Sequence, residues 1–263
     1  MATLTCYNSS YYFKDYQIAS GDVADAIVAI RTELLSRNVP AWTEPSTALF
    51  KSPTDAAGRF FDCLFTKIDQ QTLELRVRNQ VGTTVCTRRF QAGVTPWMCR
   101  IFSGQFHLLV ECWNAGGYAH LFGGILDQSP DPQGSNPCYV YGGGLLSAAN
   151  LNDGYSSVGR CFMNDGNGSA YADRSTAYGT SNNASACMYH MNGAKIYRPA
   201  ETYAYYDSGA NMRVAGRKYQ YVLCTSDLWY GTKVQVPIDN VSGTFLVTCL
   251  PTWYGLRTAC RIA

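Results

Sequence analysis

The clearest helical pattern in the chain lies within residues 20–38. Four apolar residues recur there at spacings of four, three and four, which places them on one face of a helix. They are Val23, Ile27, Ile30 and Leu34. Ser20 or Asp22 can cap the first amides, and Pro40 closes the segment. The pattern predicts an amphipathic helix over residues 20–38.

The hydrophobic period changes to two after residue 59. Phe61, Cys63 and Phe65 alternate with more polar neighbours, and the same alternation returns after a turn at residues 69–71. Further strands are expected at residues 85–90 and 106–112. The pattern predicts an antiparallel meander within residues 59–112, which forms with the helix an α+β module over residues 1–115.

The middle of the chain, residues 116–212, loses this periodicity. It contains the glycine triplet 142–144, the segment Asp165-Gly-Asn-Gly168 and a long Ser/Asn/Ala/Tyr stretch over 169–192. Ordinary loops have a median length of about four to six residues, so a region this long points to a functional or interface-forming insertion. We therefore expect a Gly/Ser/Asn/Tyr-rich loop insertion here.

Strand patterns return in the last part of the chain, residues 213–263. Alternating β-branched or aromatic residues predict strands at 218–224, 233–238, 244–248 and 255–261. We expect this C-terminal β segment to complete the sheet system of the first module. The predicted fold class is therefore α+β, mostly β.

Charge is scarce in this sequence. Asp, Glu, Lys and Arg make up 15% of the 263 residues, whereas about 25% is usual. The chain instead contains 24 Gly and 19 Tyr. A surface of uncharged polar groups and tyrosine favours permanent contact with other subunits or adhesion to a ligand. The net charge of +2 gives no basic field for phosphates, so no nucleic-acid partner is expected.

Targeting signals are not apparent in the sequence. No apolar run of 18 residues predicts a membrane span, and residues 1–6 contain neither a basic run nor an apolar stretch typical of a secretory signal. The 11 cysteines are scattered and form no CxxC pair, which favours reduced, buried thiols.

Tyrosines of the middle and following regions are the candidate contact residues. Tyr, Ser, Gly and Asn together make adaptable surfaces for a partner or a sugar, whereas an equally valid interpretation places such aromatic residues in the core. The candidates for an interface or ligand contact are Tyr139, Tyr141, Tyr155, Tyr171, Tyr178, Tyr203, Tyr205 and Tyr206.

Groups for catalysis are few. The histidines are His107, His120 and His190, and none stands beside a motif that positions a nucleophile. The Cys187-Met-Tyr-His190 spacing lacks the second ligand pair of a zinc site. P-loop and dinucleotide-binding glycine motifs are absent from the sequence. We expect no enzymatic activity, no catalytic residues, no cofactor and no metal.

Several segments give the chain a resemblance to a known group of proteins. FKSPTDAAGRFF at 50–61, TVCTRR at 84–89 and IFSGQFH at 101–107 resemble uncharacterised structural proteins of tailed bacteriophages and prophages. LDQSP at 126–130 and AGRKYQ at 215–220 continue the resemblance, as does VPID at 236–239. The resemblance implies a virion component that is assembled in the bacterial cytoplasm in many symmetric copies and brings no catalytic residues.

Three functions are compatible with these observations. The first is a tail, neck or baseplate-region component that assembles with copies of itself and with other virion proteins. The second is a receptor-binding or adhesion module whose tyrosine-rich loops contact glycans of the host surface. The third is a capsid decoration protein, which would differ from the first in its copy number per particle.

Overall fold

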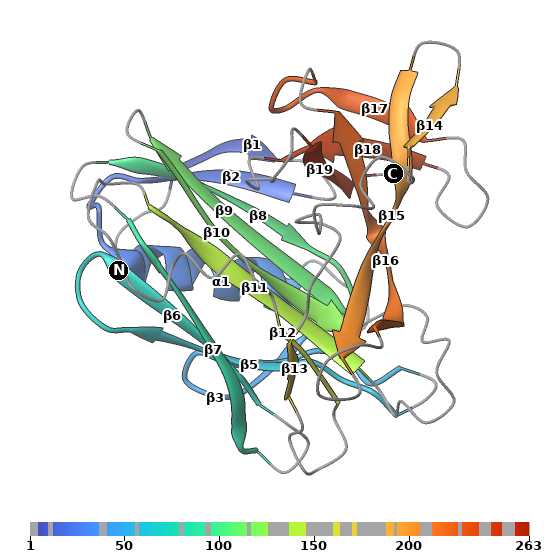
Figure 1. Ribbon diagram of the computed structural model, residues 1–263. Helices are drawn as coiled ribbons and strands as arrows, with labels where there is room; N and C mark the ends of the chain where they lie inside the picture. Colours follow the sequence, from blue (N-terminus) through green and yellow to red (C-terminus); the bar gives the residue numbers. More distant parts are fainter. Residues whose placement is uncertain are drawn as a thin grey trace.

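The fold is described from a computed structural model, in which the chain is mostly β with a helix near the N-terminus, as the sequence predicts (Figure 1). The structure describes residues 5–9, 13–36, 41–55, 58–78, 82–92, 96–114, 117–125, 137–145, 160–163, 170–172, 188–191, 194–205, 212–225, 228–236, 243–248 and 256–262. The described strands fall into two sheets.

The first sheet takes its strands from the N-terminal and middle parts of the chain. These are β1 (Thr5–Ser9), β2 (Phe13–Ile18), β3 (Thr43–Ser46), β4 (Leu49–Lys51), β5 (Asp62–Lys67), β6 (Thr72–Arg78), β7 (Thr84–Gln91), β8 (Trp97–Ser103), β9 (His107–Asn114), β10 (Gly117–Ile125), β11 (Pro137–Leu145), β12 (Arg160–Met163) and β13 (Ala170–Ala172). The order is β1-β2-β8-β9-β10-β11-β7-β6-β5-β4-β3, and β12 and β13 follow β11 on a side branch.

The expected meander is present only in part. Strands β5, β6 and β7 pair in sequence as antiparallel neighbours. The fourth expected strand, β9, pairs instead with β8 and β10, while β7 joins β11 in parallel at Gln91 and Leu145. The sheet therefore consists of two antiparallel groups of strands that meet at β7 and β11.

The second sheet is formed by the later part of the chain. Its strands are β14 (Met188–Met191), β15 (Ala194–Tyr205), β16 (Met212–Thr225), β17 (Lys233–Val236), β18 (Gly243–Val247) and β19 (Leu256–Arg261), in the order β14-β15-β16-β19-β18-β17. The strands expected from residue 213 onward are confirmed. They pair with β14 and β15 in a sheet of their own, whereas we expected them to complete the first one.

The middle region contains more strands than its composition predicts. Strands β10 to β15 lie within residues 116–212. The glycine triplet 142–144, part of the expected loop insertion, lies inside β11, where Gly142, Gly143 and Gly144 pair with Leu121, His120 and Ala119 of β10. Pairing with a neighbouring strand thus overrides the low strand propensity of glycine at these positions.

The helix α1 (Val23–Ser36) confirms the predicted amphipathic segment. Its apolar face is buried, with Val23, Ile30 and Leu34 fully shielded from solvent, and Ile27 packs at the margin. Alanines at positions 26 and 29 share this face and allow the helix to approach the sheet closely. The helix contacts β2, β3, β5 and β8, which come from both groups of strands (Figure 1).

One hydrophobic core therefore lies between α1 and the face of the first sheet that α1 covers. Phe50, Phe65 and Leu75 enter it from one group of strands, and Ile101 and Val110 enter it from the other. Burying a large side chain stabilises the fold by about 1.5–3 kcal/mol, so this shared core joins the two groups. Within the described residues, no helix is long and apolar enough to cross a membrane.

The opposite face of β2, β8 and β9 is also buried. Phe13, Phe102 and Leu109 alternate with the residues of the helix-facing core, and the rings of Phe13 and Phe102 lie 5.2 Å apart. Phe245 and Val247 of β18 are fully buried as well, outside the helix-facing core. The first sheet is thus covered on both faces along these three strands, by α1 on one side and by polar and aromatic contacts with the second sheet on the other.

Candidate functional site

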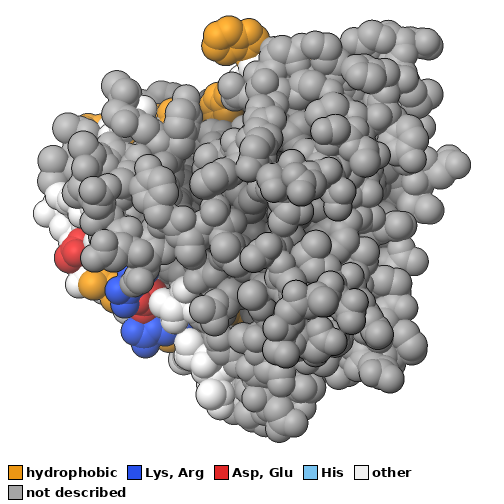
Figure 2. Space-filling view, in the orientation of Figure 1, with side chains coloured by type: hydrophobic (Ala, Val, Ile, Leu, Met, Phe, Trp, Pro, Cys, Tyr) orange, Lys and Arg blue, Asp and Glu red, His pale blue; other side chains and the backbone are white. Residues whose placement is uncertain are grey.

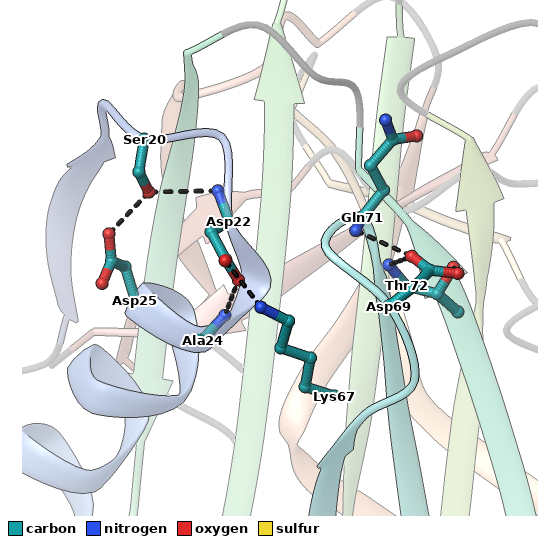
Figure 3. Close-up of polar contacts among 8 residues, drawn as sticks. All are labelled: Ser20, Asp22, Ala24, Asp25, Lys67, Asp69, Gln71 and Thr72. Atoms are coloured by element: carbon teal, nitrogen blue, oxygen red, sulfur yellow. Dashed lines mark hydrogen bonds and ion pairs between the residues drawn. The ribbon is translucent and has the colours of Figure 1, made fainter.

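Polar side chains gather at the N-terminus of α1, and Figure 3 shows how they lie. Asp22 accepts a hydrogen bond from the Ala24 amide at 2.8 Å and from the Lys67 ammonium at 2.6 Å. Burial alone would raise the pKa of Asp22, but these contacts outweigh it and lower the pKa. Ser20 donates to Asp25 and accepts from the Asp22 amide. These bonds cap the helix, as the sequence predicts.

A second carboxylate in the same view belongs to the β5–β6 turn (Figure 3). Asp69 accepts hydrogen bonds from the amides of Gln71 and Thr72 and from the Thr72 hydroxyl, at 2.7–2.9 Å. Slight burial acts to raise the pKa of Asp69, and these bonds lower it overall. The carbonyl of Gln70 in this turn accepts from the Val23 amide, so the turn fixes the start of α1. The polar contacts of Asp22 and Asp69 therefore serve to cap α1 and to form the β5–β6 turn.

A buried ion pair lies on the opposite face of the first sheet. Arg100 of β8 and Asp15 of β2 are register partners, and the guanidinium donates from Nε and Nη2 to the two carboxylate oxygens at 2.6 and 2.7 Å. Both residues are buried, at 8% and 6% exposure. This two-point geometry is the strongest form of an arginine–carboxylate contact.

The ion pair belongs to a row of charged residues across the three strands β2, β8 and β9. Glu111 of β9 is the register partner of Arg100 on its other side and is fully buried. His120 of β10 is in turn the register partner of Glu111. Burial raises the pKa of the Cys260 thiol in β19, and the negative charge of the Glu111 carboxylate raises it further. Arg100 and Glu111 therefore lie on the face of the first sheet that is turned toward the second sheet.

Aromatic rings surround the Arg100 guanidinium. Its carbon lies 4.8 Å from the ring centre of Phe13 and 5.2 Å from the ring centres of Trp113 and Tyr230. Burial alone would lower the pKa of Arg100, but its bonds to Asp15 and the nearby Tyr230 and Glu111 raise it. Arg100 therefore stays charged, and the attraction between a cation and aromatic faces is strengthened by exclusion of water.

Tyr230 links this site to a turn of the second sheet. Its ring packs edge-on against Trp113 at 5.6 Å. The Thr232 amide donates to the Trp229 carbonyl at 3.0 Å, and Gly231 has φ of 81°, as the third position of a type II turn requires. Gly231 and Thr232 also bond to Val247 of β18. The turn is thus held by its own bonds, by β18 and by the Arg100 site.

This turn presents Trp229 to solvent. Trp229 is 80% exposed although its neighbour Tyr230 packs against Trp113 and Arg100. In the described part of the chain, Ile68 at 46% is the other large hydrophobic side chain with high exposure. An exposed tryptophan on a turn with fixed backbone geometry is a typical anchor for a binding partner. We take the Trp229 turn, residues 229–232, as the candidate interaction site.

Charges on the outer face of β6 and β7 compensate one another. Glu74 is fully buried and contacts the guanidinium groups of both Arg76 and Arg89, which are themselves partly exposed. Figure 2 shows basic and acidic side chains next to each other on one side of the molecule. Arg76 and Arg89 therefore share one carboxylate partner.

The predicted tyrosines fall into three groups. Tyr139 of β11 and Tyr171 of β13 are both register partners of Cys161 in β12, so the sheet brings them into one row. Tyr141 pairs in register with Phe122, while Tyr203 and Tyr205 lie in β15 of the second sheet. Strands β13 and β15 contact each other. The remaining candidates, Tyr155, Tyr178 and Tyr206, lie outside the described residues, and all eight stay predictions.

The histidines do not converge. His107 opens β9 beside the β8–β9 turn, and a Cβ added to Gly104 would lie 1.9 Å from its imidazole, so the ring covers that glycine. Burial lowers the pKa of His107 to about 4. His190 of β14 is the register partner of Lys195 in the second sheet. Among the described residues, no group of three or more His, Cys, Asp or Glu is placed to hold a metal ion.

Sequence reasoning missed Arg100, Glu111 and Trp229. The register that brings Asp15 to Arg100 joins strands distant in the sequence, which no local pattern reveals. Trp229 carries a weak signal, because a glycine follows two residues later in a tight turn. Comparison of the chain with protein-family models and with curated proteins finds no match to either.

Proposed function

We propose that the protein is a structural component of a tailed-bacteriophage particle, from its tail, neck or baseplate region. It acts by binding copies of itself and neighbouring virion proteins, and the proposal assigns it no catalytic activity. The observation that carries the proposal is Trp229, 80% exposed on a turn that three sets of contacts hold in place. The resemblance of segments such as residues 50–61 to phage structural proteins supplies the biological setting.

Rigid presentation favours binding through Trp229. A tryptophan buries about 150–250 Å² in an interface, which at about 25 cal/mol per Å² gives about 4 kcal/mol or more. Association normally loses part of such a gain to ordering of the side chain and its loop. Here the hydrogen bonds of Gly231 and Thr232 order the backbone beforehand. The Trp229 turn can therefore contribute most of its contact energy to an interface.

The low charge of the chain supports the same proposal. With 15% charged residues and a net charge of +2, copies of the protein repel one another weakly. The charges of the described part are also used internally, as in the Asp15–Arg100 pair and around Glu74. Such a surface suits a protein that works in contact with others of its kind.

Copy counting in purified particles tests this function. Tail and capsid fractions of a phage that encodes the chain are separated, and the protein is quantified by mass spectrometry against known tail and capsid proteins. A copy number of a small multiple of three, six or twelve in the tail fraction is expected. Hundreds of copies in the capsid fraction would favour decoration, and absence from every fraction would overturn the proposal.

The Trp229 turn is tested separately in the purified protein. Trp229→Ser removes the exposed ring and should shift sedimentation from oligomer toward monomer, while Ile68→Ser serves as the matched control at the other exposed hydrophobic. A circular dichroism spectrum like that of the unchanged chain verifies folding. An identical oligomer distribution for the unchanged chain and both variants would exclude Trp229 as an assembly contact.

The second candidate function is recognition of host glycans. One observation favours it: register places Tyr139 and Tyr171 in one row across β11, β12 and β13, and aromatic rows stack on sugars. A glycan array with the oligomeric protein is the test. Binding that is lost in Tyr139→Ala with Tyr171→Ala, but kept in Trp229→Ser, would establish this function; an array without signal would dismiss it.

A further inference from the structure

Two cysteines face each other across the β8–β9 hairpin. Cys99 of β8 and Cys112 of β9 are register partners in an antiparallel pair, so their side chains project to the same face of the sheet. Both are fully buried thiols in the core against α1. Two thiols at directly opposed positions are the arrangement from which a cross-strand disulfide forms.

The hydrogen bonds of the hairpin fix which kind of pair this is. The Gly104 amide donates to the His107 carbonyl at 2.9 Å, so positions 104 and 107 form a hydrogen-bonded pair at the turn. Hydrogen-bonded and non-hydrogen-bonded pairs alternate along an antiparallel ladder. Counted pair by pair from the turn, Arg100 and Glu111 form a hydrogen-bonded pair, and the next pair, Cys99 and Cys112, is a non-hydrogen-bonded pair.

The pairing of β9 with β10 independently gives the same alternation of hydrogen-bonded and non-hydrogen-bonded pairs. The Ile125 amide donates to the Phe106 carbonyl at 3.0 Å. Along the β9–β10 register this makes Ala119 and Cys112 a hydrogen-bonded pair. The backbone N–H and C=O groups of Cys112 therefore point toward β10 and not toward Cys99 of β8.

Non-hydrogen-bonded pairs bring the two backbones closest. Their Cα atoms lie about 4.5 Å apart, whereas a disulfide accepts Cα separations of about 4.4–6.8 Å. The site is also specific. Cys63, equally buried in the same core, has Phe50 and Val77 as register partners, and Cys260 has Tyr221 and Leu246. Of the thiols in the described core, Cys99 and Cys112 are the register pair.

We propose that Cys99 and Cys112 are a redox modification site that closes to an intramolecular disulfide when the protein leaves a reducing environment. A low-molecular-weight disulfide such as oxidised glutathione is the oxidant. One thiolate attacks it, forming a mixed disulfide and releasing one glutathione thiolate, and the second cysteine displaces the other glutathione. Two protein thiols are oxidised and one glutathione disulfide is reduced, and the two protons of the protein thiols pass to the two glutathione thiolates to give two glutathione thiols.

The inference is independent of the proposed phage function, because it rests on the hairpin alone. The disulfide would join the neighbouring strands β8 and β9, which the hairpin turn at residues 104–107 connects. Since both thiols are fully buried, exchange requires local opening of the hairpin or takes place before the core is complete. A purified folded sample is therefore expected to oxidise slowly.

Peptide mapping of the full chain tests the site. The protein is purified under reducing conditions, incubated with oxidised and reduced glutathione, alkylated and digested. We expect a peptide pair linked through Cys99 and Cys112. The tryptic peptide that contains Cys112 also contains Cys138, so the mapping is repeated with Cys138→Ala. Recovery of both residues as separately alkylated thiols, or glutathione adducts that never resolve, would overturn the proposal.

Thermal unfolding supplies a second measurement. A disulfide that closes a loop of about 15 residues should raise the midpoint of thermal unfolding by about 5–10 °C in a chain of this size. The rise upon oxidation should occur in the unchanged chain and in Cys63→Ala, a matched buried control, and be lost in Cys112→Ala. An equal rise in all three proteins would assign the effect to other cysteines. Should Cys112→Ala fail to fold, the peptide map of the unchanged chain still decides.

Discussion

Arg100 and Asp15 form a buried two-point ion pair although 85 residues separate them in the sequence. The pair lies at the boundary of the two sheets, where Arg100 also meets the Tyr230 ring. Removing one partner of such a pair leaves the other charge buried without its two-point contact. The ion pair therefore links β2 to β8, and through the contact of Arg100 with Tyr230 it helps to position the turn that presents Trp229.

Asp15→Asn is expected to lower the free energy of unfolding by about 3–5 kcal/mol, because it leaves the Arg100 charge without its carboxylate. Lys67→Met is the control. It breaks the more exposed contact between Lys67 and Asp22 and should lower the free energy of unfolding by about 1 kcal/mol or less. Urea unfolding followed by tryptophan fluorescence measures both, and similar losses for the two variants would contradict the predicted effect of burial.

The protein should lose stability as the pH falls below about 6.5. Burial lowers the pKa of His107 to about 4, so between pH 6.5 and 4 the unfolded chain binds a proton that the folded chain does not. The whole pKa difference between the folded and unfolded chain corresponds to a loss of about 3 kcal/mol in the free energy of unfolding. Because His107 keeps partial contact with solvent, we expect a loss of about 2 kcal/mol. His107→Gln should remove this part of the pH dependence between pH 7 and 4.5, while an unchanged slope would show that carboxylates alone cause it.

Ala48→Gly should stabilise the β3–β4 turn. Ala48 has φ of 57°, in the left-handed region that costs a residue with a Cβ about 1–2 kcal/mol. Glycine recovers part of this cost and loses some to the entropy of the unfolded chain, for a net gain of up to about 1 kcal/mol. Ala29→Gly, inside α1, is the control and should be destabilising by about 1 kcal/mol or more. Equal thermal shifts of the two variants would contradict the argument.

Gly124→Ala is expected to be destabilising by more than about 2 kcal/mol. A Cβ at position 124 would lie 2.4 Å from the Phe106 carbonyl oxygen, and backbone atoms cannot move aside cheaply. At Gly231 the space around an added Cβ is open and only the φ of 81° is unfavourable, so Gly231→Ala should lose about 1 kcal/mol. Denaturant midpoints that rank the two variants in the reverse order would contradict the predicted packing.

The sequence predicts the elements whose surroundings differ between their two faces. The segment that forms α1 has one apolar face, and β5 has an alternating pattern because one face is buried and the other is less so. Strand β8 was not predicted. It is buried on nearly every position because α1 covers one face and the second sheet approaches the other, and burial on both faces removes the period of two.

The candidate site was less accessible to sequence reasoning than the fold. The scarcity of charge predicts a surface suited to contacts, but the residues that form the candidate site depend on strand register. Asp15, Arg100 and Glu111 are isolated charges in their own segments, and they become a row only after β2, β8 and β9 are aligned. Trp229 depends in the same way on Tyr230 packing against the other sheet.

The pairing of β2 with β8 has a consequence for synthesis of the chain. β2 ends at Ile18 and β8 begins at Trp97, so a ribosome adding about 5–20 residues per second makes the intervening segment of about 80 residues in about 4–16 s. During that interval β2 has β1 as its one strand neighbour in the described sheet order, and Phe13 lacks the Phe102 ring of β8 against which it packs. During synthesis, β2 is therefore accessible to a ribosome-associated chaperone until β8 is made.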